Sequence, residues 1–177
     1  MVIEVLRIGQ RLVRDDRVTT HVALVARAFG ASKIYMNEIN PEIKNTLERV
    51  NKTWGGNFEI VFIDEWERVV KDRKRNSFKI IHLTMYGENI NYLESLVKEE
   101  NDLLVVVGAE KVPRELYDLS DYNIAIGNQP HSEISALAVL LDRIQRGRQF
   151  SNIFSEAHRK IVPTKQGKKV IVNKTRD

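Results

Sequence analysis

Cysteine is absent from this 177-residue sequence. The absence excludes a disulfide framework, a thiolate metal site and a cysteine nucleophile. It is compatible with a reducing cytosol, and we expect a cytoplasmic protein. The four histidines, His21, His82, His131 and His158, show no metal-ligand spacing, so we expect no metal site. Of these, His82 is expected to pack on or beside a strand.

Long apolar runs and the common phosphate-binding motifs are missing as well. No run approaches the roughly 20 residues that span a bilayer, and the start of the chain lacks the pattern of a signal peptide. Neither G-x-G-x-x-G nor G-x-x-x-x-G-K-S/T occurs, which excludes the usual dinucleotide and P-loop cradles. No G-x-S-x-G motif occurs, which excludes the nucleophile elbow of many hydrolases.

The positive charge of the chain is concentrated near its C-terminus. The net charge is +4, yet residues 143–177 carry ten Lys and Arg against two Asp and Glu, while the remaining residues carry eighteen against twenty-two. A basic segment on a mildly acidic body favours a polyanionic partner such as nucleic acid. A solvated charged tail without a partner explains the same distribution, so charge alone leaves both possibilities open.

Short apolar segments rich in Val and Ile alternate with longer amphipathic segments along the chain. Strands are predicted at residues 2–8, 33–36, 58–63, 78–84, 102–108 and 122–127, and helices at 41–54, 64–75, 88–100 and 131–147. A further helix is predicted from a cap at Thr19 or Thr20 through Phe29, with Gly30 closing it. This alternation is typical of an α/β fold with a mostly parallel sheet.

Three loops that follow the fourth, fifth and sixth predicted strands each carry a glycine near the strand exit. These glycines are Gly87, Gly108 and Gly127, and polar residues continue from the last of them through 128–132. In an open α/β sheet, ligands bind beyond the carboxyl ends of the strands. Glycine and polar residues are also ordinary in strand-to-helix turns, so a ligand site and a plain connection both remain open.

The basic C-terminal segment contains two short apolar runs, 161–162 and 170–172, on either side of P-T-K-Q-G-K-K. With Gly167 placed to allow a turn, this pattern predicts a β-hairpin rather than a disordered arm. We expect its apolar face to pack on the body of the same subunit or on a partner subunit. The chain therefore divides into a domain at 1–147 and a basic extension at 148–177.

Four segments of the chain together resemble a known family of enzymes. They are R-D-D-R-V-T-T-H-V-A-L-V-A-R-A-F-G-A, H-L-T-M-Y-G, V-V-V-G-A-E-K-V-P and I-A-I-G-N-Q-P-H-S-E, in this order. The set is similar to the SPOUT class of RNA methyltransferases, and within it to the archaeal tRNA cytidine-56 2′-O-methyltransferases. The resemblance implies a deep trefoil knot, S-adenosylmethionine as methyl donor, methylation of a T-loop ribose in tRNA, and a homodimer.

The same resemblance implies which residues form the donor site. They are Leu83, Gly108, Ala109, Glu110, Lys111, Val112, Ile126, Gly127, Asn128, Gln129, Pro130, His131, Ser132 and Glu133. The first motif of one subunit is expected to face the donor bound by the other.

The candidate catalytic residues lie in the first motif and are Arg17, His21 and Arg14. An arginine can stabilise the negative charge that develops on a ribose hydroxyl or hold a phosphate, and His21 has a side chain suited to proton transfer. Many ribose-methylating relatives carry an arginine where this chain has Leu24, so the polar groups stand earlier here. A backbone-bonded histidine and a surface salt bridge are the structural alternatives for His21 and Arg17.

Two other functions share the expected fold. One is a methyltransferase that acts on a base nitrogen of RNA, and the other is an RNA-binding module without catalysis. The second predicts degenerate donor loops, whereas all three loops of this sequence match the family pattern.

Overall fold

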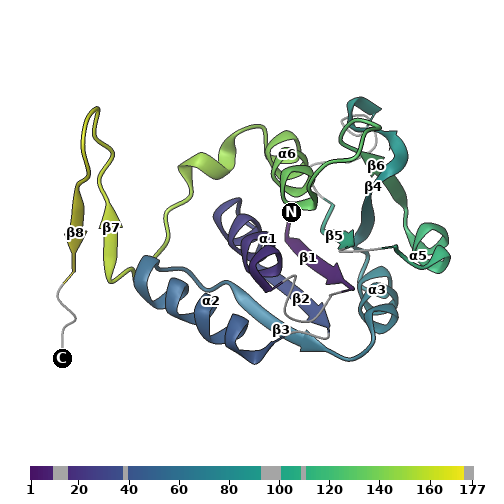
Figure 1. The fold of residues 1–177 in the computed structure, drawn as a ribbon, viewed down its shortest axis with the longest axis horizontal. Coiled ribbons are helices and arrows are strands. Elements are labelled where there is room, and N and C mark those ends of the chain that lie inside the picture. Colours follow the sequence, from purple (N-terminus) through teal and green to yellow (C-terminus); the bar gives the residue numbers. More distant parts are fainter. Residues whose placement is uncertain (10–15, 38–39, 93–100, 109–110, 174–177) are drawn as a thin grey trace.

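The computed structural model describes residues 1–9, 16–37, 40–92, 101–108 and 111–173. Its centre is a six-stranded sheet in the order β3-β2-β1-β5-β4-β6, in which every neighbouring pair is parallel (Figure 1). The strands are β1 (Ile3–Ile8), β2 (Lys33–Asn37), β3 (Glu59–Ile63), β4 (Lys79–Asn89), β5 (Leu103–Gly108) and β6 (Tyr122–Ala125). The predicted α/β fold with a mostly parallel sheet is thus confirmed.

Helices cover both faces of this sheet. They are α1 (Asp16–Ala28), α2 (Pro41–Trp54), α3 (Trp66–Arg75), α5 (Arg114–Leu119) and α6 (Glu133–Gln145). Side chains of α1, α2 and α6 pack on one face, and those of α3 and α5 pack on the other. Alternate residues of a strand point to opposite faces, so a strand covered on both sides is apolar throughout, as in β5. No helix in the described part of the chain is long and apolar enough to cross a membrane.

The predicted ends of α1 and α2 are confirmed where glycine follows the helix. Gly30 has φ +83°, its N–H donates to Arg27 O, and Ala31 N–H donates to Ala26 O, which together form a Schellman motif. Gly55 has φ 81° and its N–H donates to Asn51 O. A left-handed backbone ends each helix, and glycine adopts it without a steric penalty.

The predicted start of α1 is wrong, because Thr19 and Thr20 lie inside the helix, which already includes Asp16. Thr20 Oγ1 donates to the carbonyl of Asp16 at 2.8 Å, one turn earlier, and Thr19 Oγ1 accepts from a buried arginine, Arg7. Neither hydroxyl is therefore available as a cap.

Two further elements depart from the sequence prediction. Strand β4 continues to Asn89, and Ile90–Tyr92 forms a 3₁₀ turn, so the first residues of the predicted 88–100 helix are not α-helical. Residues 93–100 of that helix lie outside the described residues. Helix α5 has only six residues, too few to show a helical period, and was not predicted.

The pairing of β4 with β6 is interrupted at residues 84–87. Its register shifts between Leu83 and Glu88, both of which pair with Ile124. The interposed segment approaches β6 so closely that a Cβ on Gly87 would lie 2.4 Å from Asn123 O. Glycine is therefore required at this position by contact with backbone.

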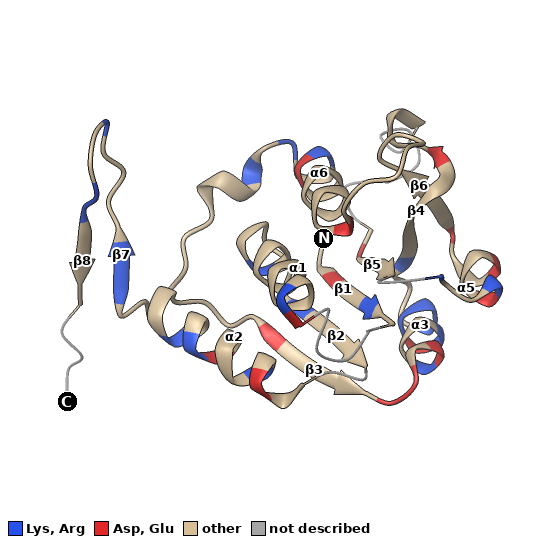
Figure 2. Cartoon of the chain, in the orientation of Figure 1, with Lys and Arg blue, Asp and Glu red and all other residues tan. Residues whose placement is uncertain are grey.

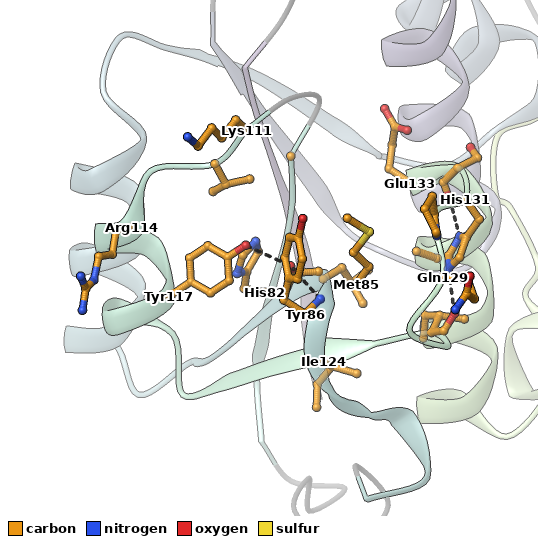
Figure 3. Close-up of a pocket in the computed structure, with 18 residues that line it drawn as sticks. His82, Met85, Tyr86, Lys111, Arg114, Tyr117, Ile124, Gln129, His131 and Glu133 are labelled. Atoms are coloured by element: carbon orange, nitrogen blue, oxygen red, sulfur yellow. Dashed lines mark hydrogen bonds between the residues drawn. The ribbon is translucent and has the colours of Figure 1, made fainter.

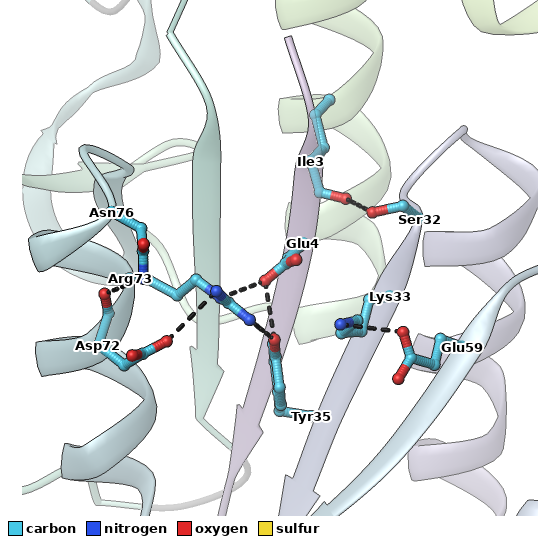
Figure 4. Close-up of polar contacts among 9 residues, drawn as sticks. All are labelled: Ile3, Glu4, Ser32, Lys33, Tyr35, Glu59, Asp72, Arg73 and Asn76. Atoms are coloured by element: carbon cyan, nitrogen blue, oxygen red, sulfur yellow. Dashed lines mark hydrogen bonds and ion pairs between the residues drawn. The ribbon is translucent and has the colours of Figure 1, made fainter.

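Helix α3 is held to the sheet by a partly buried polar cluster (Figure 4). Tyr35 OH donates to Glu4 Oε2 at 3.0 Å, and Arg73 Nε forms an ion pair with the same carboxylate at 2.7 Å. Burial is the main cause that raises the pKa of Tyr35, so its hydroxyl stays protonated and can donate. The three groups satisfy one another, which allows charged side chains to lie beneath a helix.

The C-terminal segment forms the predicted hairpin, with β7 (Arg159–Ile161) antiparallel to β8 (Val170–Val172) and Gly167 at φ +85° (Figure 1). The segment before it is docked on the body. Gly56 N–H donates to Ser155 O at 2.8 Å, and the Arg27 guanidinium lies 4.6 Å from the centre of the Phe154 ring. The hairpin itself projects away from the sheet, and its apolar side chains are exposed.

Candidate functional site

A pocket of about 730 Å³ lies where β4, β5 and β6 end (Figure 3). Its lining residues come from the three strand-exit loops and from the starts of α5 and α6. They are His82, Leu83, Thr84, Met85, Tyr86, Gly108, Lys111, Val112, Arg114, Tyr117, Ile124, Ile126, Gln129, Pro130, His131, Ser132, Glu133 and Ala136. The volume is in the range of sites that hold a small organic molecule.

Most residues of the predicted donor site meet in this pocket. Those that line it are Leu83, Gly108, Lys111, Val112, Ile126, Gln129, Pro130, His131, Ser132 and Glu133. Gly127 and Asn128 are next to it but do not line it, and Ala109 and Glu110 lie outside the described residues. The sequence therefore predicted which loops converge here.

The loop between β6 and α6 is held by its own side chains. Ser132 caps α6 by accepting a hydrogen bond from Ile134 N–H at 3.1 Å. The ring nitrogens of His131 face the carbonyl oxygens of Ile126 and Ser132 at 2.7 and 3.1 Å. These contacts hold the backbone of the loop in its present conformation.

Asn128 connects two of the loops. Its Nδ2 donates to Met85 O at 2.8 Å and to Gly87 O at 3.1 Å. The side chain of Asn128, which the sequence placed in the donor site, thus bonds to the backbone of residues 84–87 of β4.

The carboxylate of Glu133 is turned toward β1 and α1. Its Oε1 forms an ion pair with Arg7 Nη1 at 3.2 Å, and Arg7 Nε donates to Thr19 Oγ1 at 2.9 Å. Arg7 is only 2% exposed, and these close partners offset the cost of burying its charge. The pair joins the pocket wall to the helix that carries the first motif.

His82 lies within β4 as expected, fully buried beneath α5. Its Nδ1 is 2.8 Å from Asn123 Oδ1, and Asn123 Nδ2 donates to Tyr117 O, so the amide oxygen must accept and Nδ1 must carry the proton. Burial lowers the pKa of His82, and the hydrogen bond to Asn123 opposes this only in part. A neutral imidazole therefore packs edge-on against the Tyr117 ring.

The candidate catalytic residues do not line the pocket of their own chain. Arg17 and His21 are both exposed and lie four residues apart in α1, which places them on one face of the helix. In the described part of the chain, neither makes a hydrogen bond or ion pair, so neither structural alternative raised by the sequence is found. Arg14 lies outside the described residues.

Several lining residues were not predicted from the sequence. Tyr86, Arg114 and Tyr117 reach the pocket because β4 runs beyond its expected end and because α5 packs next to it. The loop motif after the fourth strand was a signal for Tyr86, whereas a six-residue helix leaves no comparable signal.

No group of three or more His, Cys, Asp or Glu side chains with metal-binding geometry occurs among the residues that the structure covers.

Comparison with known proteins relates residues 54–171 to a family described as tRNA ribose 2′-O-methyltransferase, aTrm56. A protein of Nitrosopumilus maritimus is 67% identical over 177 residues and 100% of both chains, and one of Methanocaldococcus jannaschii is 49% identical over 98% of both. A protein of Cenarchaeum symbiosum is 57% identical over 97% of both chains. All three are named tRNA (cytidine(56)-2′-O)-methyltransferase.

Solved structures agree on the fold. The TrmH/SpoU tRNA modifying enzyme of A. aeolicus matches with a TM-score of 0.60 at 18% identity, over 85% of this chain and 76% of that one. The SpoU methyltransferase AviRb of Streptomyces viridochromogenes, solved in complex with AdoMet, matches with a TM-score of 0.60 at 13% identity, over 83% and 57%.

Proposed function

Since the chain belongs to the tRNA ribose 2′-O-methyltransferase family, we propose that it methylates the ribose of cytidine 56 in the T-loop of tRNA, with S-adenosylmethionine as donor. The membership was expected from the four sequence motifs. The observation that carries the proposal is the convergence of three strand-exit loops on one pocket, which contains ten of the predicted donor residues.

The pocket has the chemistry that an adenosine-containing donor needs. Leu83, Val112, Ile124 and Ile126 supply apolar walls for the nucleoside, and the fixed backbone of the β6–α6 loop supplies polar groups. Apolar walls with a few placed polar groups are typical of nucleoside sites. The methyl donor supplies an activated methyl group on a sulfonium.

In the reaction, the ribose 2′-oxygen attacks the methyl carbon in line with the carbon–sulfur bond. A carbon–oxygen bond forms, the carbon–sulfur bond breaks with its electron pair left on sulfur, and the hydroxyl proton leaves. Positioning of the two reactants supplies much of the rate. Arg17 stabilises the negative charge that develops on the oxygen or holds an adjacent phosphate, and His21 is suited to accept the proton.

A homodimer belongs to this proposal because the pocket and the catalytic candidates are separated within one chain. The exposed face of α1 with Arg17 and His21 would complete the pocket of a second subunit. The exposed apolar side chains of the hairpin support an association between chains. A trefoil knot, a catalytic domain at 1–147 with an extension at 148–177, and a cytoplasmic location complete the proposal.

Incubation of unmodified tRNA transcript with protein and S-adenosylmethionine tests the activity. We expect one added methyl group by mass spectrometry and a nuclease-resistant linkage after cytidine 56, because 2′-O-methylation removes the attacking hydroxyl. A transcript with 2′-deoxycytidine at position 56 is the control and should remain unmodified. A tRNA that gains a methyl group but is still cleaved by nuclease after cytidine 56 would refute ribose methylation and assign the methyl group to a base.

A further inference from the structure

We propose that Lys111 and Arg114 bind backbone phosphates of the tRNA substrate and that Tyr86 stacks on one of its bases. The inference rests on the proposed function and adds to it the side from which RNA enters the pocket. Nothing in the sequence motifs assigns Arg114 or Tyr86, and Lys111 was expected only as part of a donor loop.

The two cations occupy one side of the pocket. Figure 3 shows Lys111 and Arg114 on the side of α5, across from Gln129, His131 and Glu133. Both side chains are exposed, and neither forms an ion pair or hydrogen bond with another residue of the described ranges. Two exposed cations at a pocket rim that have no ion-pair partner among the described residues are suited to bind an anionic ligand.

No acidic side chain of the described pocket lining pairs with these cations. The acidic side chain among the described lining residues is Glu133, and its carboxylate is paired with the buried Arg7 at 3.2 Å. The charged side chains that line the pocket on the α5 side are therefore the cations Lys111 and Arg114, among the described residues. Phosphate groups are the anions that a tRNA substrate offers in a regular series along its backbone.

An exposed aromatic ring stands at the same mouth. Tyr86 is 75% exposed, although Asn128 fixes the segment around it through the carbonyls of Met85 and Gly87. An exposed ring on a fixed segment loses little freedom when a flat partner packs on it. Nucleobases stack on such rings without sequence preference.

The cation side also has a firm support. Tyr117, three residues after Arg114, packs against His82 with ring centroids 4.7 Å apart, and its hydroxyl shares a hydrogen bond of 3.1 Å with Thr84. Helix α5 is thus anchored to β4 from within the pocket. Arg114 therefore extends from an anchored helix, and Lys111 precedes that helix by three residues in the loop.

The carboxylate of S-adenosylmethionine is the other anion that could meet these cations. Separate affinities for donor and tRNA distinguish the two. We expect Lys111→Gln and Arg114→Gln each to raise the Kd for tRNA at least about tenfold and to lower the salt slope of log Kd by about one. For Arg114→Gln, which changes no predicted donor residue, the Kd for S-adenosylmethionine should stay within about twofold of wild type.

Binding is measured with S-adenosylhomocysteine present, so that it does not depend on turnover. Arg75→Gln is the control, because Arg75 is an exposed cation near the amino end of β4, whereas the pocket lies at the carboxyl ends of the strands. Tyr86→Ala should weaken tRNA binding about tenfold, whereas Tyr86→Phe, which keeps the ring, should not.

An unchanged salt slope in both cation variants overturns the proposal, as does a donor Kd of Arg114→Gln that rises as much as its tRNA Kd. Either result leaves the proposed function intact if the wild-type protein methylates tRNA. A wild-type protein without methyl transfer refutes the proposed function instead, whatever the binding data show.

Discussion

The residue type at position 87, next to the pocket, is constrained by neighbouring backbone atoms rather than by side chains. Asn123 O, Asn123 C and Ile124 N would lie 2.4, 2.5 and 2.6 Å from a Cβ added to Gly87. None of these atoms belongs to a side chain that can rotate away. The conformation of residues 84–87 therefore requires glycine at position 87 as much as it requires the hydrogen bonds from Asn128.

We expect Gly87→Ala to lower the free energy of unfolding by about 2 kcal/mol, since the methyl group must displace β6 backbone. Urea denaturation measures the change, and donor affinity should fall with it because β6 leads into the pocket. The matched variant is Gly127→Ala, which adds the same methyl group where nothing lies within 4 Å. Its cost comes from its positive φ alone, about 1 kcal/mol. Equal losses in the two variants would contradict the steric explanation.

His82 makes the stability of the protein depend on pH. Its folded-state pKa is lowered by burial, so below about pH 6.5 the unfolded chain takes up a proton that the native state resists. The contribution of neutral His82 to the free energy of unfolding is therefore fully present above the unfolded-state pKa. It is lost as the pH falls toward the folded-state pKa.

Replacement His82→Gln should flatten the fall in unfolding free energy between about pH 7 and pH 5, because glutamine keeps a donor for Asn123 but does not titrate. Denaturant titrations at several pH values provide the measurement. His158→Gln changes an exposed histidine and serves as the control. A profile for His82→Gln that is parallel to wild type would show that the imidazole is not the group responsible.

At the scale of elements, the hairpin presents two unequal faces. Its pairing register joins Ile161 to Val170 and Arg159 to Val172, so these side chains share one face, whereas Lys160 and Ile171 share the other. The first face is the more apolar, and its Ile161, Val170 and Val172 are 62%, 47% and 55% exposed. An isolated hairpin is marginal in water, so a covered apolar face would stabilise it.

We expect Val170→Lys to weaken homodimer formation at least about tenfold, because a charge would then be buried against the partner. Sedimentation equilibrium at several concentrations gives the dimer Kd. Ile171→Lys introduces the same charge on the opposite face and should change the dimer Kd much less. If both variants dimerise like wild type, the hairpin does not hold the subunits together.

The elements also show how far the sequence can predict a structure. The parallel strands and the glycine-closed helices were predictable because their signals are local, in apolar runs and in the left-handed residues Gly30 and Gly55. The long β4 was not, since residues 84–87 leave the ladder and β4 rejoins it at Glu88 only through contacts with β6. Arg114 and Tyr117 were missed for a similar reason: their place in the site depends on packing between distant segments.

At the scale of the whole molecule, a shared active site makes a further prediction. Arg17→Ala should leave donor binding unchanged and reduce methyl transfer at least about a hundredfold, the loss expected for one transition-state contact. Ile126→Trp fills the pocket and should abolish donor binding. If each site combines the pocket of one subunit with the α1 face of the other, a mixed dimer contains one intact site.

Equal amounts of the two inactive variants, unfolded together and refolded, should therefore recover about a quarter of wild-type activity, because half of the dimers are mixed and each has one working site. Refolding each variant alone is the control. Mixtures that remain inactive would place Arg17 and the pocket it serves in the same subunit.

The projecting hairpin makes the distribution of positive charge over the molecule uneven. Figure 2 shows Lys and Arg along β7 and around the hairpin tip. Lys165, Lys168 and Lys169 belong to the loop between β7 and β8 and are exposed. A positively charged arm of this kind steers association, because its electrostatic field attracts a polyanion before the rest of the surface does. Encounter would then begin at the tip, and the first contact would restrict the later search for the pocket to rotations about that anchor. Stopped-flow measurements should show that neutralising the three tip lysines slows association, while dissociation of the bound complex changes little.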